Sequence, residues 1–464
     1  MYKVPQNIDS NKVFIVQRSE IEGRLDPKMA LYNRKVQHSL YPKAKLKDLL
    51  VSKPQYGAGE PGIERKLQLE PRYIRITDID DNGLVSEDNL GATANIVEDK
   101  YILNKDDILI ARSGATVGKA YIHKPTPYDC FFAGYLIRFV VNRNKALPDY
   151  VFSYTLLNAY KEWVNAIQRP SGQPNINSEE YQSLEIPLPD ILKQQEIVDF
   201  INSAYLQRKQ KEDEAQQLLG SIDAYLLNEL GISLPEVKTD LKSRIFLVNR
   251  SKLEDRLDPT IYKDGIKLIS SRYDDVKISS IISINPTGAF KGKDVKTPIS
   301  FIPMEAIDEI YSEATCLENV TIENASGFTK FKEGDLLWAK ITPCMQNGKS
   351  AIARNLLNGL GCGSTEFYVF RPKDNMLSID YLHVILHMKC VRETAMLYFG
   401  GSAGQQRVPK SFLENFSIPL PPLNKQREIA NHVSAIRQQA KRLQEEGKAI
   451  LKNAKNDVER MIIG

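Results

Sequence analysis

The sequence is poor in the features that mark secreted, membrane and zinc-binding proteins. Only five cysteines occur among 464 residues, and no two of them form a C-x-x-C pair. Neither a disulfide framework nor a zinc knuckle is therefore indicated. The chain has no apolar run of 18 residues, and its opening MYKVPQNIDSNK contains no apolar signal core. We expect a soluble cytoplasmic protein with reduced thiols.

An excess of charge of one sign is also missing. The 62 lysines and arginines are nearly offset by 58 acidic residues, which leaves a formal net charge of +4. Nucleic-acid binding is compatible with this balance only if basic residues gather on one local face.

Recognisable catalytic motifs are absent as well. GATVGKA at 114–120 is one residue short of a phosphate loop and has Ala120 where a serine or threonine would bind magnesium. CMQNGKSA at 344–351 has Pro343 in place of the first glycine, and both stretches fall between expected strands. There is no G-x-S-x-G elbow and no Asp/Asn-Pro-Pro-Tyr/Phe tetrapeptide. We expect no catalytic residues and no cofactor.

Two histidines have a spacing that could suit a metal. His383 and His387 are four residues apart on an expected helix, but the glutamate of H-E-x-x-H is missing between them. Their neighbours are apolar, so we expect core histidines and no metal site.

What the sequence does contain is a repeat of half its length. IPLPDILKQQEI at 186–197 returns as IPLPPLNKQREI at 418–429, and VFIVQRSEIEGRLDP at 13–27 returns as IFLVNRSKLEDRLDP at 245–259. KDDILIARSGATVGKA at 105–120 matches EGDLLWAKITPCMQNGKSA at 333–351, and SGQPNI at 171–176 matches AGQQRV at 403–408. Solenoid repeats are far shorter. A domain-sized unit is therefore duplicated, which predicts pseudo-twofold symmetry.

Each copy begins strand-rich and ends in a long helix. The expected divisions are residues 1–189, 190–232, 233–421 and 422–464, in which the second and fourth segments are helices. Helices are also expected at 150–167 and 381–399. Both long segments carry an apolar heptad seam, which predicts an antiparallel coiled coil in an α+β protein. The seam positions are Ile197, Ile201, Ala204, Ala215, Leu218, Ile222 and Tyr225 in the first copy, with breaks at Arg208 and Lys211, and Ile429, Val433, Ile436, Ala440, Leu443, Gly447, Ile450, Ala454 and Met461 in the second.

With this layout the chain resembles the specificity subunit of type I restriction–modification systems. The likeness covers nearly all 464 residues and is carried by the RLDP phrases, the hairpins ending in GKA and GKS, and the phrases PLPDILKQQEI and PLPPLNKQREI. It implies a non-catalytic DNA reader with two target-recognition domains, one for each half of a split target. It also implies that the helices space these domains and dock two modification (methyltransferase) subunits, and that motor–nuclease subunits can join.

The polar loops differ most between the copies, which suits two domains that read different sequences. We expect their basic, amide and hydroxyl side chains to contact phosphates and base edges. In the first copy these residues are Lys53, Gln55, Tyr56, Arg112, Ser113, Thr116, Lys119, Arg169, Ser171, Gln173 and Asn175. In the second they are Lys291, Lys293, Lys296, Lys340, Thr342, Gln346, Asn347, Lys349, Gln405, Gln406 and Arg407. Solvated surface loops are the alternative interpretation.

Two other functions stay open on the sequence alone. One is a self-sufficient DNA methyltransferase or nuclease with a diverged site, which would modify or cleave DNA without partners. The other is a coiled-coil adaptor without a DNA role, which would show no salt-dependent DNA binding.

Overall fold

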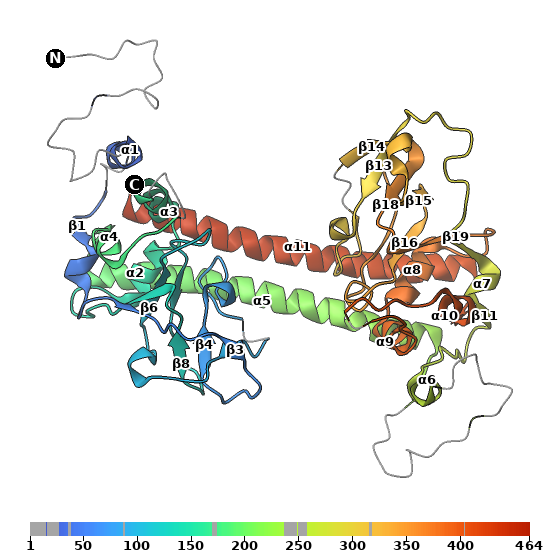
Figure 1. Cartoon of the computed structure of the whole chain (residues 1–464), viewed down its shortest axis with the longest axis horizontal. Helices are drawn as coiled ribbons and strands as arrows, with labels where there is room; N and C mark the ends of the chain where they lie inside the picture. Colours follow the sequence, from blue (N-terminus) through green and yellow to red (C-terminus); the bar gives the residue numbers. More distant parts are fainter. Residues whose placement is uncertain are drawn as a thin grey trace. The chain divides into compact units, whose positions relative to one another are not determined.

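A computed structural model describes residues 15, 27–35, 39–86, 89–168, 174–235, 248, 258–314, 318–402 and 404–464. The chain forms two compact units, Met1–Gln210 with Glu446–Gly464 and Lys211–Glu445. Both repeat copies therefore fold into comparable bodies. Figure 1 gives the element labels used below.

The described strands of the first unit lie in one small and two larger sheets. β1 (Lys43–Lys45) pairs antiparallel with β10 (Glu185–Pro187). A four-stranded antiparallel sheet has the order β2 (Gln55–Tyr56), β9 (Leu136–Phe139), β6 (Ile108–Ala111), β7 (Ala120–Ile122). The other has the order β3 (Ile63–Glu64), β5 (Ala92–Thr93), β4 (Arg72–Ile74), β8 (Cys130–Phe132), with β4 and β8 parallel. The shorter helical elements are α1 (Pro27–Lys35), η2 (Leu46–Leu49), η3 (Ile76–Asp78), η4 (Asp99–Tyr101), α2 (Pro148–Tyr154), α3 (Asn158–Ile167) and α4 (Ser178–Gln182).

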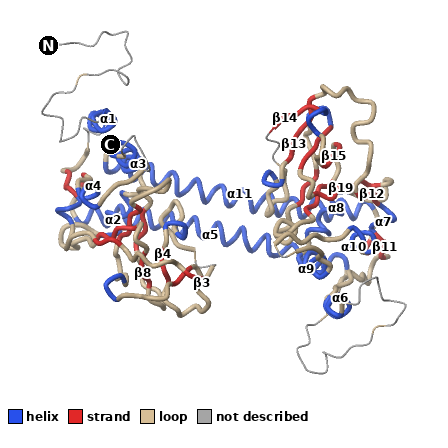
Figure 2. Tube along the Cα trace, viewed as in Figure 1, coloured by secondary structure: helices blue, strands red, loops and turns tan. Residues whose placement is uncertain are grey.

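The second unit repeats this plan. β11 (Asp275–Lys277) pairs with β20 (Ser417–Pro419). One sheet has the order β12 (Ile282–Ile284), β19 (Phe367–Pro372), β16 (Leu336–Ala339), β17 (Ser350–Ile352). The other has the order β14 (Glu318–Thr321), β13 (Pro298–Ile302), β18 (Leu360–Gly363), β15 (Thr329–Lys332). Strands are red in Figure 2. The shorter helical elements are α6 (Pro259–Asp264), α7 (Ile278–Ile281), η7 (Met304–Ala306), η8 (Ile322–Ala325), η9 (Leu357–Gly359), α8 (Ile379–His387), α9 (Lys389–Leu397) and α10 (Lys410–Asn415).

The helices expected at 150–167 and 381–399 are each broken in two. The first breaks where the Thr155 hydroxyl donates to the carbonyl of Phe152, and the second at Met388, whose ψ is 138°. After the break, α3 contributes the buried Trp163 to the core of the first unit, and α9 contributes the buried Val391 to the core of the second.

Two 40-residue helices, α5 (Ile191–Leu230) and α11 (Leu423–Ile462), contribute to both units. In the second unit they pair antiparallel, because the Tyr225 ring lies 4.2 Å from that of His432 and Glu229 bonds Lys425 at 2.7 Å. In the first unit, the start of α5 and the end of α11 enter one core through Ile197, Val198, Ile201, Ala204, Leu451, Ala454, Val458 and Ile462. The expected fold class is confirmed.

The seam prediction needs a correction near the end of each long helix. In α5, Tyr225 is only partly buried, whereas Leu226 and Leu230 are buried in the core of the second unit. The second correction concerns α11. Ile450 and Met461 are only partly buried, whereas Leu451, Val458 and Ile462 are buried. Here the helix packs against the first unit's core and not only against α5, so the buried stripe follows that core.

The repeated PLP-x-x-x-Q phrase has a structural explanation. Gln194 is buried, donates to the carbonyl of Pro189 at 2.8 Å and accepts from the backbone N–H of Leu147 at 2.8 Å. Gln426 makes the matching bonds, to Pro421 and from Ser378, both at 2.8 Å. This glutamine therefore fixes the start of each long helix to the segment before α2 or α8.

No helix in the described parts of the chain has the length and apolar character needed to cross a membrane.

Candidate nucleic-acid interface

In the first unit the hairpin loop between β6 and β7 pairs with the loop that precedes α4. Ser113 and Asn175 form an antiparallel bridge. The N–H of Gly114 donates to Pro174 at 3.0 Å, and that of Ile176 donates to Arg112 at 2.9 Å. Two candidate loops about 60 residues apart in the sequence are thus joined backbone to backbone.

The second unit makes the same junction at matching positions. Ile341 and Arg407 form the bridge. The N–H of Thr342 donates to Gln406 at 3.0 Å, and that of Val408 donates to Lys340 at 2.9 Å. We call the joined segments, 112–119 with 174–176 and 340–349 with 404–408, the paired loops.

The paired loops present different side chains on the same backbone frame. Arg112 occupies the position that Lys340 has in the second unit, and Asn175 the position of Arg407. The N–H of Arg112 donates to the carbonyl of Tyr135, just before β9, and the N–H of Lys340 donates to the carbonyl of Glu366, just before β19. Both distances are 2.9 Å. A shared frame with exchanged polar side chains is what two readers of different sequences need.

Tyr56 brings the early loop of the first unit to this junction. The Arg112 guanidinium lies 5.0 Å from the centre of the Tyr56 ring, and the Tyr56 hydroxyl accepts from the N–H of Ser178 at 3.1 Å. Nε of Arg112 is buried without a partner among the described residues.

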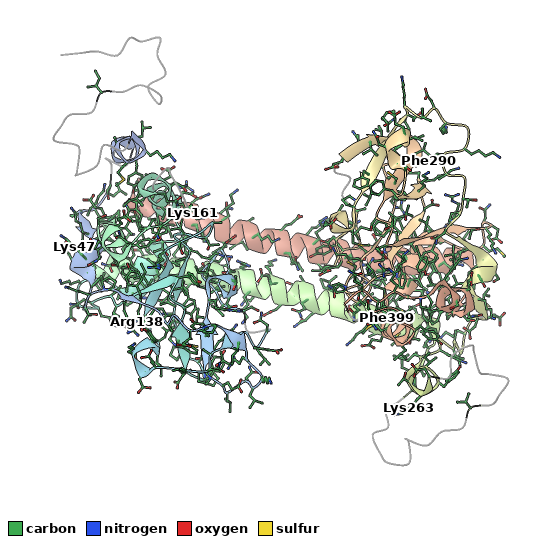
Figure 3. The ribbon with its side chains drawn as sticks, viewed as in Figure 1. Lys47, Arg138, Lys161, Lys263, Phe290 and Phe399 are labelled. Atoms are coloured by element: carbon green, nitrogen blue, oxygen red, sulfur yellow. The ribbon has the colours of Figure 1, made fainter. Side chains whose placement is uncertain are left out.

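The residues before Tyr56 in the sequence do not join the paired loops in this way. Lys53 is exposed, and Gln55 bonds to Arg138 and to the carbonyl of Lys100. Figure 3 labels Arg138.

In the second unit the early loop is not brought to the junction. Lys291, Lys293 and Lys296 are exposed. Their loop also contains Phe290, which packs on the core formed by Ile299, Ala325, Leu360 and Cys362 (Figure 3). Phe290 therefore anchors this loop beside the sheet that contains β13 and β18, while its lysines stay exposed.

The lysines of the GKA and GKS hairpins are engaged within the protein. Nζ of Lys119 donates to the carbonyl of Ile79 at 2.8 Å and lies 3.3 Å from Asp81, and Nζ of Lys349 donates to Met304 at 3.3 Å. Lys119 therefore holds its hairpin to the residues just after the 3₁₀ turn η3, and Lys349 holds its hairpin to η7. An ammonium has three protons, so each keeps at least one for another acceptor.

The longer hairpin of the second unit is supported from α9. Arg392 donates to the backbone carbonyls of Gln346 and His387. The Asn347 side chain is exposed and that of Gln346 half-buried. The backbone is therefore held while both amides are accessible.

The other predicted contact residues fall into two groups. Arg169, Ser171 and Gln173 lie outside the described residues. Thr116 accepts the N–H of Lys119 through its carbonyl at 3.0 Å, the Thr342 hydroxyl accepts from the N–H of Gln406 at 3.2 Å, and Gln405 is exposed. These three residues belong to the paired loops.

The sequence interpretation missed Tyr135 and Glu366. Tyr135 has 63% of its surface exposed, and Glu366 bonds Arg407. Aligning AGYLIRF with STEFYVF would have placed both residues next to the hairpins.

Two aspartates beside the central strands and the expected core histidine His383 have structural partners. Asp107 and Asp335 are buried, and Asp335 forms two bonds of 2.6 and 2.7 Å with Arg371. His383 is buried beside the Ser350 hydroxyl at 3.1 Å, and burial lowers its pKa to about 3. It is therefore a neutral core residue, as predicted. His387 is only partly buried, so the prediction of a core position is not met there.

Comparison with known proteins relates this chain to a family of DNA specificity domains. The family described as "Type I restriction modification DNA specificity domain" matches residues 72–218 and 271–452. The specificity subunit of the type I restriction enzyme EcoEI from Escherichia coli is 38% identical over 164 residues, which are 35% of this chain and only 27% of that protein. The putative type I restriction enzyme MjaX specificity subunit from Methanocaldococcus jannaschii is 23% identical over 354 residues, 73% of each protein.

A solved structure supports the fold. A chain from work on complex assembly and conformational transition of the type I R-M system aligns over 90% of this chain and 96% of its own length, with a TM-score of 0.51 and 15% identity. The two regions matched by the family together cover most of the sequence. The chain belongs to the type I restriction–modification DNA specificity family and is a specificity subunit.

Proposed function

We propose that the chain reads a DNA target in two parts, one with the paired loops of each unit. The observation that carries this proposal is the identical backbone junction in both units, with Arg112 and Asn175 in one exchanged for Lys340 and Arg407 in the other. Arginine, lysine and asparagine are suited to base edges in the major groove and to phosphates.

The reading segments in this proposal are residues 1–189 and 233–421, and the long helices at 190–232 and 422–464 are spacers. The contact set is the one expected from the sequence. Tyr56, Arg112, Asn175, Lys340, Gln346, Asn347 and Arg407 form its centre, because they lie on or against the paired loops. Lys119 and Lys349 lie at the ends of the hairpin loops, and each ammonium would donate a proton that the protein leaves free to a DNA phosphate.

The chain is proposed to act without its own catalysis. It would direct two modification subunits, which carry methyl transfer, and motor–nuclease subunits that join them. The long helices supply the docking surface in this arrangement.

Selection from a randomised duplex library by the chain bound to its modification subunits tests the proposal. We expect two enriched sequence blocks separated by unselected positions. The Arg112→Ala/Asn175→Ala variant should lose information in one block, and Gln346→Ala/Asn347→Ala in the other. A single continuous block, or equal loss of both blocks in either variant, would contradict it.

A further inference from the structure

Arg407 is held through its backbone on two sides. Its backbone exchanges hydrogen bonds with Gly400, at 2.9 and 3.0 Å, and bridges Ile341 on the other side. Phe399, labelled in Figure 3, immediately precedes this turn. A backbone fixed from two sides limits where the side chain can point.

The guanidinium is fixed as well. Nε donates to one carboxylate oxygen of Glu366 at 2.9 Å, and Nη2 donates to the other at 2.8 Å. Nη1 donates to the carbonyl of Gln405 at 3.0 Å. These bonds hold the pKa of Glu366 below its usual value, so the pair is ionic.

Two donors of Arg407 remain. A guanidinium has five N–H groups, and three are used within the described part of the chain. The remaining two are one on Nη1 and one on Nη2, and 42% of the side chain is exposed. The arginine therefore keeps one N–H on each of its two terminal nitrogens for another acceptor.

The frame does not require this ion pair. The first unit makes the same backbone junction with Tyr135 and Asn175 in place of Glu366 and Arg407. The loops can therefore be joined without an ion pair at these two positions, and the Glu366–Arg407 pair is particular to the second unit.

We propose that Glu366 positions Arg407 to read one guanine in the part of the target addressed by the second unit, an inference that rests on the proposed function. Paired N–H donors match the O6 and N7 acceptors of guanine in the major groove. Both oxygens of Glu366 already accept from Arg407. The carboxylate is therefore a positioning residue, and the arginine makes the contact.

The test uses the chain assembled with its modification subunits on its selected duplex. Each guanine of the second block is replaced in turn by 7-deazaguanine, which lacks the N7 acceptor. At one guanine we expect wild-type affinity to fall about tenfold, in line with loss of a bidentate contact. In Arg407→Ala the same replacement should have little further effect, because contact and acceptor belong to one interaction.

Glu366→Gln should relax selection at that same base pair and at no other. The matched control is Glu414→Gln, which breaks an exposed pair with Lys410 (2.8 Å) in the same unit and should leave base selection unchanged. Thermal unfolding of all variants should stay within a few degrees of wild type.

Different outcomes would contradict the proposed function and the role of Arg407. Wild-type binding without any sequence preference would overturn the proposed function. Normal wild-type selection would overturn the inference alone if the second block contained no guanine, if no 7-deazaguanine weakened binding, or if Arg407→Ala and Glu366→Gln lowered affinity for all sequences equally.

Discussion

Val408 donates its backbone N–H to the carbonyl of Lys340 at 2.9 Å and joins two loops that are far apart in the sequence. In the first unit Ile176 donates to Arg112 at the same distance. Backbone bonds carry no information about side chains, so the junction can be kept while the side chains that it presents change. This separation of frame and readout underlies the proposed function.

Replacing Gln346 and Asn347 with alanine should relax recognition in one block only. Arg392 holds the hairpin through the backbone carbonyl of Gln346, so the loop should keep its shape when the amides are removed. Each lost bidentate contact should cost about 1–3 kcal/mol of discrimination. Binding to duplexes with single changes in either block measures this, and weaker discrimination in both blocks would count against it.

Gln194→Met should destabilise the first unit. The substitution keeps the volume but leaves the N–H of Leu147 and the carbonyl of Pro189 without the buried amide that they bond. The expected loss is about 2–4 kcal/mol in the free energy of unfolding, measured in urea. The control is Gln195→Met on the exposed face of the same helix, where the change should stay within about 0.5 kcal/mol. Equal effects of the two variants would refute the anchoring role of Gln194.

Acid should destabilise the second unit through His383. Burial and the nearby Arg437 lower its pKa to about 3, against about 6.5 in an unfolded chain. Between these values the unfolded state binds the extra proton, so stability is lost as the pH falls below about 6.5, at up to about 1.4 kcal/mol per pH unit. His383→Gln should lose less stability than wild type between pH 7 and pH 5. Parallel pH profiles would show that His383 does not contribute. His387, whose pKa burial also lowers, remains in both proteins.

The two long helices should set the unread gap between the parts of the target. We expect one heptad inserted after Gln210 and one after Glu445 to preserve the apolar seam. Each insertion adds about 10 Å of helix, or up to about 3 base pairs. The selected blocks should stay the same while the gap grows. Two-residue insertions at the same places should instead rotate the seam and impair assembly. A fully active heptad variant with an unchanged gap would show that the helices do not set the spacing.

The sequence predicted the duplication, the long helices and the loops that meet at the junction, because these leave local signals in phrases such as RLDP and PLPDILKQQEI. Helix breaks at Thr155 and Met388 were missed because helical periodicity continues across them. The burial of Val458 in place of Met461 depends on a core built by distant residues. Glu366 was missed for a similar reason: its partner Arg407 is 41 residues away, and only the folded junction brings them together.

The early loops also could not be placed from composition. Lys53 and Lys291 occupy comparable polar stretches, yet Tyr56 reaches the junction in one unit while Phe290 packs on a sheet in the other. Tertiary packing decides whether such a loop reaches the paired loops or packs on a sheet, and loop sequences carry little information about that packing.

The direct test of DNA reading by this chain is to map methylated bases in DNA exposed to the modification subunits, with and without the chain. We expect methylation to require the chain and to fall in one two-part sequence whose parts flank an unread gap. Methylation of the same sites without the chain, or at sites with no common two-part sequence, would contradict it.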